Sequence, residues 1–248
     1  MKIKKISDKL KWAGEQVMTL LYPDICPFCG RILKWDEKGR VCKMCQFKLP
    51  YIHEPRCKKC GKPIDKDDQE YCWDCEHHRH YYDRGLSVWE HQPAVAQAIY
   101  QFKYHNRRIY SRYFAREMVK LYGSIIYQWN INLIVPIPIS KKRRRKRGYN
   151  QAVLVAREIS QNTAIPMDDK RLIRTRDTIA QKKLDVLSRK KNLFGAFAWK
   201  GKKEPLGNVL LIDDIYTTGN TIDAAARILK SSGASKVYFL TVSIGDGF

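Results

Sequence analysis

The sequence predicts an α/β protein, a parallel sheet flanked by helices, preceded by a small cysteine-rich module. Two observations carry this prediction. From about residue 82, short apolar runs of strand type alternate with helical patterns, an order typical of a parallel sheet. All 8 cysteines lie between residues 26 and 75 of the 248-residue chain, which indicates a module organised by metal rather than by a large core.

The bulk properties are those of a globular intracellular protein. Hydrophobic residues make up 44% of the chain, and no uninterrupted apolar run approaches the roughly 18 residues that a membrane span needs. The N-terminal segment lacks an apolar stretch followed by a small-residue cleavage site, so we expect no secretion signal. We therefore expect a cytoplasmic protein, in which clustered cysteines need a reason other than disulfides.

The first element, within residues 1–23, is an amphipathic helix over residues 3–21. Apolar side chains recur there at alternating three- and four-residue steps, with lysines on the other face. We expect this helix to dock on its own protein. Peripheral contact with the inner face of the membrane, or with a partner helix, is the alternative.

Residues 24–80 contain four Cys-x-x-Cys units, each able to aim two thiolates at one ion. Two such units complete the four-sulfur site that Zn²⁺ prefers, so we predict two structural zinc ions in a double zinc ribbon. Sequential pairing of the units is favoured because each ribbon then closes locally, and interleaved pairing is the alternative. The predicted ligands are Cys26, Cys29, Cys42, Cys45, Cys57, Cys60, Cys72 and Cys75.

Three histidines near the second ribbon, His77, His78 and His80, are spare once the cysteines fill the metal sites. We expect them to be solvated surface residues rather than ligands.

Residues 81–248 carry the sheet. In chain order the patterns predict helices over 94–104 and 109–128, a strand over 131–138, a helix over 150–162, a strand over 208–216, a helix over 220–232 and a strand over 236–244.

The candidate ligand site follows a buried strand, Val209 to Ile212. Asp213 and Asp214 stand at its carboxyl end, the edge at which open α/β sheets bind ligands. Thr217, Thr218, Gly219, Asn220 and Thr221 then open into a helix, and hydroxyls, free N–H groups and a helix N-terminus all favour a phosphate. The pattern suits a sugar phosphate, with the carboxylates on the ribose hydroxyls. The alternative is an acidic strand end before an N-capped helix.

The net charge of +22 is concentrated. Residues 141–196 hold 17 Lys/Arg against 5 Asp/Glu, a net of +12, and Lys141–Arg147 is an unbroken basic run. Such a field favours a polyanion, and we expect the run to contact nucleic acid; a solvated loop is the alternative. Aromatics nearby could stack bases, but we expect them to belong to the core; they are Tyr100, Phe102, Tyr104 and Tyr149.

The stretch VLLIDDIYTTGNT (209–221) matches the phosphoribosyl-diphosphate-binding motif of type I phosphoribosyltransferases. Over nearly its whole length the chain resembles the ComF-type late-competence proteins, in which zinc ribbons precede such a domain. The other matching stretches are LLYPDICPFCGR (20–31), YQFKYHNRR (100–108), IVPIPISKKRRRKRGYNQ (134–151) and the segment 174–197.

The resemblance implies a type I phosphoribosyltransferase-like sheet and assigns its site residues. Asp213 and Asp214 would hold the ribose hydroxyls as the catalytic pair, and residues 217–221 the 5′-phosphate. The diphosphate, with Mg²⁺, would meet Pro136, Ile137, Pro138, Ile139, Ser140 and Lys141. The same cleft would be lined by Arg147, Gly148, Tyr149, Asn150 and Gln151. A loop closing over the ligand would span 174–196, with Gln181, Arg189 and Asn192 on the family pattern and Ile179-Ala180 where prolines are common.

The resemblance also implies a role in the uptake and handling of single-stranded DNA during natural transformation, beside a helicase-like competence protein. Two alternatives stay open. One is an active phosphoribosyltransferase that moves a 5-phosphoribosyl group to an amine or base, although no hood for binding the nucleophile can be named. The other is a regulator that senses the metabolite and binds nucleic acid.

Overall fold

The computed structural model describes residues 23–34, 37, 41–66, 68–175 and 195–245. The expected N-terminal helix lies outside the described residues, as do Gln181, Arg189 and Asn192 of the expected closing loop. The chain divides into two compact units, Met1–Leu49 and Pro50–Phe248. Residues 24–80, which the sequence groups into one cysteine-rich domain, therefore contribute to both units.

The first unit is organised around two cysteine turns. Gly30 ends the first turn in the left-handed conformation, with φ at 71°, and its N–H donates to the carbonyl of Cys26 at 2.9 Å. The second turn opens α2 (Lys43–Lys48), where the Cys42 sulfur accepts from the N–H of Cys45 at 3.5 Å. In each turn a backbone N–H thus donates to the first cysteine of the pair, to its carbonyl oxygen in one turn and to its sulfur in the other.

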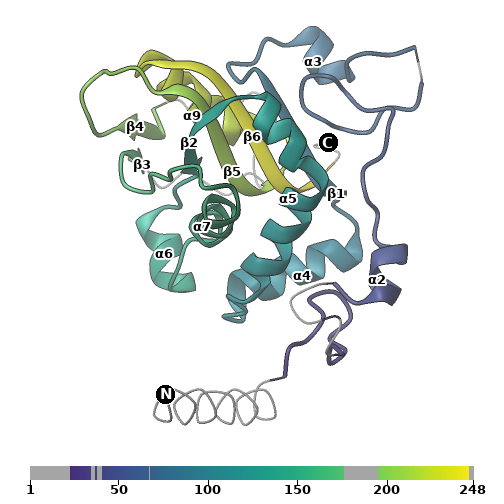
Figure 1. Ribbon diagram of the computed structural model, residues 1–248. Helices are drawn as coiled ribbons and strands as arrows, with labels where there is room; N and C mark the ends of the chain where they lie inside the picture. Colours follow the sequence, from purple (N-terminus) through teal and green to yellow (C-terminus); the bar gives the residue numbers. More distant parts are fainter. Residues whose placement is uncertain (1–22, 35–36, 38–40, 67, 176–194, 246–248) are drawn as a thin grey trace, which may run out of the picture. The chain divides into compact units, whose positions relative to one another are not determined.

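The second unit contains a four-stranded parallel sheet in the order β1-β6-β5-β2 (Figure 1). Val209 to Ile212 are fully buried, as expected of a central parallel strand covered on both faces. Because β5 has a neighbour on each side, its carboxyl end emerges in the middle of the sheet edge. The strands are β1 (Arg84–Glu90), β2 (Ile131–Pro136), β5 (Gly207–Tyr216) and β6 (Ala234–Ile244).

Helices cover the two faces of this sheet. One face carries two helices packed on each other, and the other face is covered by the helix between β5 and β6 (Figure 1). Within the described part of the chain, none of the helices combines the length and apolar character that crossing a bilayer requires. The first face carries α5 (Tyr110–Gln128) and α7 (Gln151–Thr163), α4 (Pro93–Tyr104) precedes α5, and α9 (Asn220–Ser231) lies on the second face.

The second cysteine cluster belongs to the core of this unit. Cys57, Cys60 and Cys72 are at most 7% exposed and share one hydrophobic cluster with residues of β5, β6 and α9. A Cβ on Gly61 would lie 2.8 Å from the carbonyl oxygen of Gly85, so only glycine lets this turn approach β1. The unit is completed by α3 (Trp73–His77) and the antiparallel pair β3 (Leu172–Arg174) and β4 (Phe197–Trp199).

The parallel sheet flanked by helices confirms the predicted fold class, and the seven predicted elements are present with ends shifted by at most two residues. The basic run is not the loop of the alternative expectation, because it forms a helix, α6 (Lys141–Arg147). Ser140 caps its start, with Oγ accepting from the N–H of Arg143 at 3.3 Å, and Gly148 ends it in the left-handed conformation.

Candidate functional site

The acidic pair lies at the carboxyl end of β5. The Asp214 N–H donates to Oδ1 of Asp213 at 2.9 Å, which fixes the first carboxylate against the backbone. The second carboxylate is held by Lys103 of α4, whose Nζ lies 2.8 Å from Asp214 Oδ1. Both side chains of this ion pair are largely buried, at 16% and 14% exposure. Sequence reasoning missed Lys103, because nothing local in the helix marks it as a neighbour of β5.

Burial and the neighbouring charge of Asp214 raise the pKa of Asp213 to about 7, and the positive charges of Lys103 and Arg174 oppose this rise. Asp213 therefore changes its protonation state close to neutral pH. Only the ionised form accepts hydrogen bonds with both oxygens, so the ability to hold a diol depends on that change.

The segment from Thr217 to Thr221 passes from β5 into α9. Gly219 caps the helix with φ at 70°, and a Cβ there would lie 2.3 Å from Oη of Tyr216, whose ring lies beneath the turn. The buried Oγ1 of Thr218 finds no hydrogen-bond partner among the described residues. A buried hydroxyl left unsatisfied beside a helix N-terminus fits a site that is completed by an anion.

The segment 136–141 lies beside the acidic pair. The N–H of Ile137 donates to the carbonyl of Ile212 at 2.9 Å, and Asn150 Nδ2 donates to the carbonyl of Ile137 at the same distance. These bonds hold the turn that contains Pro138 and Ile139 against the end of β5. Ser140 is buried as the cap of α6, and Lys141 is exposed.

The residues 147–151 divide between surface and interior. Arg147 donates to Gln151 Oε1 at 2.9 Å and to Oη of Tyr104 at 3.1 Å. Tyr149 and Gln151 are buried, at 6% and 1% exposure, and the Tyr149 hydroxyl donates to the carbonyl of Phe102. Asn150 therefore braces the turn at 136–141 from inside, and Tyr149 fastens the same segment to α4, whereas Gly148 is exposed and Arg147 is partly exposed.

The cysteines form two four-sulfur groups with sequential pairing, as favoured from the sequence: Cys26, Cys29, Cys42 and Cys45, and Cys57, Cys60, Cys72 and Cys75. The Sγ atoms of Cys29 and Cys42 lie 3.7 Å apart, and those of Cys60 and Cys72 lie 3.6 Å apart. Zn–S bonds of about 2.3 Å in a tetrahedron put sulfurs about 3.8 Å apart, so both groups fit Zn²⁺. Four thiolates leave no open position, so these are structural zinc sites.

The three histidines do not share one environment. His77 is exposed, as expected, and its ring stacks on Trp73. The expectation of a solvated surface residue is wrong for His80, whose side chain is 6% exposed. The ring of His80 is buried because it stacks on Tyr82, with centroids 4.9 Å apart.

Comparison with known proteins agrees with this architecture. The family model of a double zinc ribbon domain matches residues 17–76, and that of a phosphoribosyl transferase domain matches residues 119–243. Fold and cysteine sites thus define a double zinc ribbon joined to a phosphoribosyltransferase-like domain.

Three relatives are similar over most of their length. Competence protein ComFC of Bacillus subtilis is 31% identical over 208 residues, 82% of each chain. Competence protein F of Haemophilus influenzae is 27% identical over 217 residues, 86% of this chain and 93% of the relative. The DNA utilization protein YhgH of Escherichia coli is 25% identical over 231 residues, 92% and 93% of the two chains. The chain belongs to this ComF family of competence and DNA utilization proteins.

Proposed function

We propose that the protein binds phosphoribosyl diphosphate with Mg²⁺ at the carboxyl edge of β5 and β2, and acts in the handling of single-stranded DNA during natural transformation. One observation carries the ligand assignment. An acidic pair, a glycine turn with a buried unsatisfied hydroxyl at Thr218, and the turn at 136–141 meet at one edge of the sheet.

Each part of this edge matches one part of the ligand. The carboxylates of Asp213 and Asp214 accept the ribose hydroxyls, and the N–H groups of residues 217–221 meet the 5′-phosphate. Ser140 and Lys141 face the diphosphate with its Mg²⁺. Lys103 balances the charge of Asp214, since the two form a largely buried ion pair.

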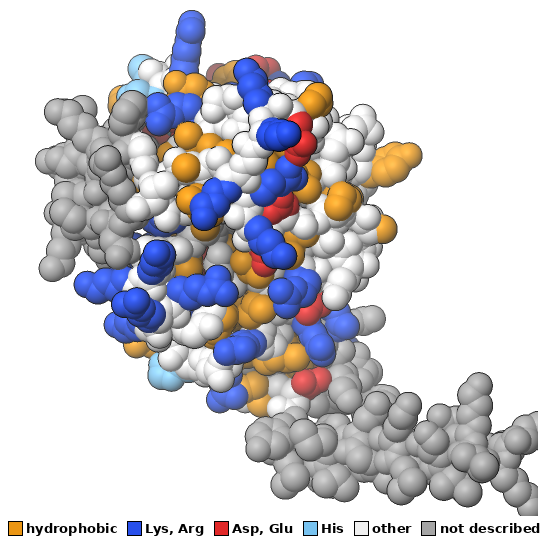
Figure 2. All heavy atoms as spheres, turned by 90° about the vertical axis from the view of Figure 1, so that its left-hand side faces the viewer, with side chains coloured by type: hydrophobic (Ala, Val, Ile, Leu, Met, Phe, Trp, Pro, Cys, Tyr) orange, Lys and Arg blue, Asp and Glu red, His pale blue; other side chains and the backbone are white. Residues whose placement is uncertain are grey.

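The nucleic acid surface is assigned to α6 and its surroundings. An open hollow of about 770 Å³ is lined by Lys141, Lys142, Arg145 and Lys146. In the part of the chain that the structure describes, no acidic side chain lies within ion-pair distance of these four cations. Lys and Arg side chains spread over one face of the molecule in Figure 2. Uncompensated cations on a short helix suit a row of phosphates.

Four aromatic side chains near the basic run were expected in the core, and two of them are exposed instead. Phe102 and Tyr149 are buried, but Tyr100 and Tyr104 are 50% and 43% exposed. Arg147 lies 5.0 Å from the centre of the Tyr104 ring. Exposed rings next to cations are the surface on which unpaired bases stack, so we assign Tyr100 and Tyr104 to the same DNA surface.

The biological context comes from the family. Relatives carry the names competence protein and DNA utilization protein, and the proposed DNA surface gives this chain a matching activity. A helicase-like competence protein is the proposed partner, because single-stranded DNA is what such a motor delivers.

The test measures two affinities of the zinc-loaded protein, for phosphoribosyl diphosphate with Mg²⁺ and for a single-stranded oligonucleotide. In Asp213→Asn/Asp214→Asn, the affinity for phosphoribosyl diphosphate should fall at least tenfold and the affinity for the oligonucleotide should stay unchanged. A second variant should lose affinity for the oligonucleotide and keep its affinity for phosphoribosyl diphosphate. It carries the four substitutions Lys141→Gln, Lys142→Gln, Arg145→Gln and Lys146→Gln. If the wild-type protein leaves phosphoribosyl diphosphate unbound, the ligand assignment is wrong.

The same preparation separates binding from transfer. Release of diphosphate from bound phosphoribosyl diphosphate, when amines and nucleobases are offered, would establish the active transferase instead. Binding without diphosphate release supports the protein as a ligand-responsive DNA-handling factor.

A further inference from the structure

The second zinc ribbon lies against the phosphate segment through a chain of buried hydroxyls. Sγ of Cys75 lies 3.8 Å from Oη of Tyr82, and that hydroxyl lies 2.7 Å from Oη of Tyr216. The Tyr216 hydroxyl is in turn the atom that a Cβ on Gly219 would strike. A metal ligand is therefore three contacts away from the glycine that caps α9.

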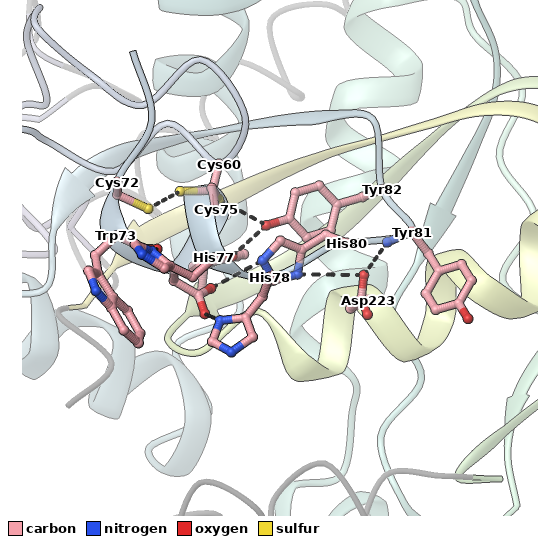
Figure 3. Close-up of polar contacts among 12 residues, drawn as sticks. Cys60, Cys72, Trp73, Cys75, His77, His78, His80, Tyr81, Tyr82 and Asp223 are labelled. Carbon is pink, nitrogen blue, oxygen red and sulfur yellow. Dashed lines mark hydrogen bonds and ion pairs between the residues drawn. The ribbon is translucent and has the colours of Figure 1, made fainter. Parts of the chain in front are cut away.

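A second route runs from the same ribbon to the first turn of α9 (Figure 3). Asp74, which lies between two metal ligands, is 3.2 Å from Nε2 of His80. Nδ1 of that ring lies 3.7 Å from Oδ1 of Asp223, the carboxylate that also accepts the N–H of Tyr81. The segment that leaves the ribbon is thus fastened directly to the helix that follows the phosphate segment.

The link is packed tightly. Tyr82 is fully buried, and its ring meets Phe239 edge-on with centroids 5.0 Å apart. Tyr216 stacks on the same phenylalanine, at 4.9 Å and 8° between planes. Close-packed rings transmit a displacement rather than absorb it, because interior side chains have no space into which to move.

We propose that zinc in the second ribbon positions the phosphate segment 217–221, with Tyr82 and His80 as the positioning residues between them. Anion binding at residues 217–221 then requires metal at Cys57, Cys60, Cys72 and Cys75, and is independent of metal at the first ribbon. The identity of the anion, phosphoribosyl diphosphate, rests on the proposed function, whereas the coupling itself rests on the contacts above. The second ribbon thus supports the phosphate segment through Tyr82, Tyr216 and Asp223.

Two matched double variants test the coupling. Cys57→Ser/Cys60→Ser and Cys26→Ser/Cys29→Ser should each reduce the zinc content from two ions to one, by metal analysis. Amide hydrogen exchange of residues 217–221 should speed up at least tenfold in the first variant and stay unchanged in the second. Affinity for phosphoribosyl diphosphate with Mg²⁺ should fall only in the first. Equal behaviour of the two variants would overturn the proposal.

A milder substitution decides the matter if the first variant loses its whole fold. Tyr82→Phe keeps the ring and removes the hydroxyl bonded to Tyr216. It should retain two zinc ions and normal exchange in β5 and β6, yet show faster exchange at residues 217–221 and roughly fivefold weaker phosphoribosyl diphosphate binding. Tyr122→Phe is the matched control, since it removes a buried tyrosine hydroxyl bonded at 2.6 Å to the carbonyl of Ser87, outside the phosphate segment.

Double substitution sharpens this result. Tyr82→Phe and Tyr216→Phe remove the same hydrogen bond, so the double variant should be no worse than the poorer single variant. Additive losses, or normal exchange at residues 217–221 in Tyr82→Phe, would refute the positioning role. A wild-type protein that binds no sugar diphosphate would contradict the ligand assignment alone, because the exchange measurements need no ligand.

Discussion

Single residues set the conditions under which the proposed site at the end of β5 can bind its ligand. Asp213 is an acid whose proton leaves near neutral pH, and its neighbour Asp214 is held by Lys103. Thr218 and Gly219 provide for the phosphate. The Thr218 hydroxyl has no hydrogen-bond partner among the described residues, and the turn beside it has room only for glycine at position 219.

The raised pKa of Asp213, about 7, predicts pH-dependent binding. About a tenth of this carboxyl is ionised at pH 6 and about nine tenths at pH 8, so affinity for phosphoribosyl diphosphate should rise about tenfold over that range. Titration calorimetry checks the rise, with Asp213→Asn as the control that removes ionisation of the protein but keeps that of the ligand. An equal rise in both proteins would refute the assignment.

The raised pKa of Asp213 affects folding stability in the opposite direction, because stability falls as pH rises. A carboxyl whose pKa is raised in the folded state favours the folded state below its unfolded pKa, and this stabilisation is lost as pH rises from about 4 through about 7. Asp213→Asn should therefore flatten the decline in unfolding free energy over that range. Urea unfolding of both proteins at pH 5 and pH 8 measures the difference.

Gly219 and Gly195 form a natural comparison. Both adopt the left-handed conformation, with φ at 70° for Gly219 and 73° for Gly195. A Cβ on Gly195 would meet none of the described residues within 4 Å, whereas one on Gly219 would strike Tyr216. Gly195→Ala should cost only the backbone term of about 1 kcal/mol. Gly219→Ala should cost at least about 1 kcal/mol more and abolish sugar diphosphate binding, which urea unfolding and calorimetry check. Similar losses for the two would exclude a close fit at Gly219.

Among the elements, α6 is the one whose sequence least suggests a helix. Seven consecutive cations repel one another at every i,i+4 position, and the helix forms through its ends, at Ser140 and Gly148. The proposed DNA contact relies on that geometry, because a capped helix keeps its charged side chains in one row.

The charge on α6 predicts a salt dependence. The four-residue Gln set at Lys141, Lys142, Arg145 and Lys146 should lower the slope of log affinity against log salt for single-stranded DNA by up to about 3, at roughly 0.7 per phosphate contact. An equal set on exposed lysines elsewhere, Lys200, Lys202, Lys203 and Lys236, should lower it far less. Equal slopes for the two sets would mean that net charge alone attracts DNA.

Much of the second unit could be predicted from its sequence, for reasons visible in particular elements. Helix and strand periodicities are local, so α5 and β5 were placed to within a residue or so. Contacts between distant segments were not visible, and these include Lys103 beside Asp214 and Tyr82 beside Tyr216. The cysteines were recognised as ligands, but their share in a hydrophobic core follows from packing that spacing does not encode.

For the whole molecule, the two zinc sites have unequal protection. Cys29 is exposed in the first site, whereas three of the four sulfur ligands of the second are buried. A strong chelator should therefore remove one zinc quickly and the other slowly, in two phases of equal amplitude, and thermal stability should drop only with the slow phase. Cys26→Ser/Cys29→Ser should eliminate the fast phase. A single phase for both ions would contradict the inequality.

The burial of Cys57, Cys60 and Cys72 in the same cluster as β5 and β6 has a consequence for biosynthesis. These cysteines leave the ribosome well before residues 207–244, which contain β5 and β6. A zinc ion bound early at the cysteines is therefore buried once these strands have been synthesised and have folded. A cell short of zinc would then make chains whose sheet closes on unliganded thiols. The supply of metal at the time of synthesis, more than its later concentration, would decide how much of the protein reaches its folded form.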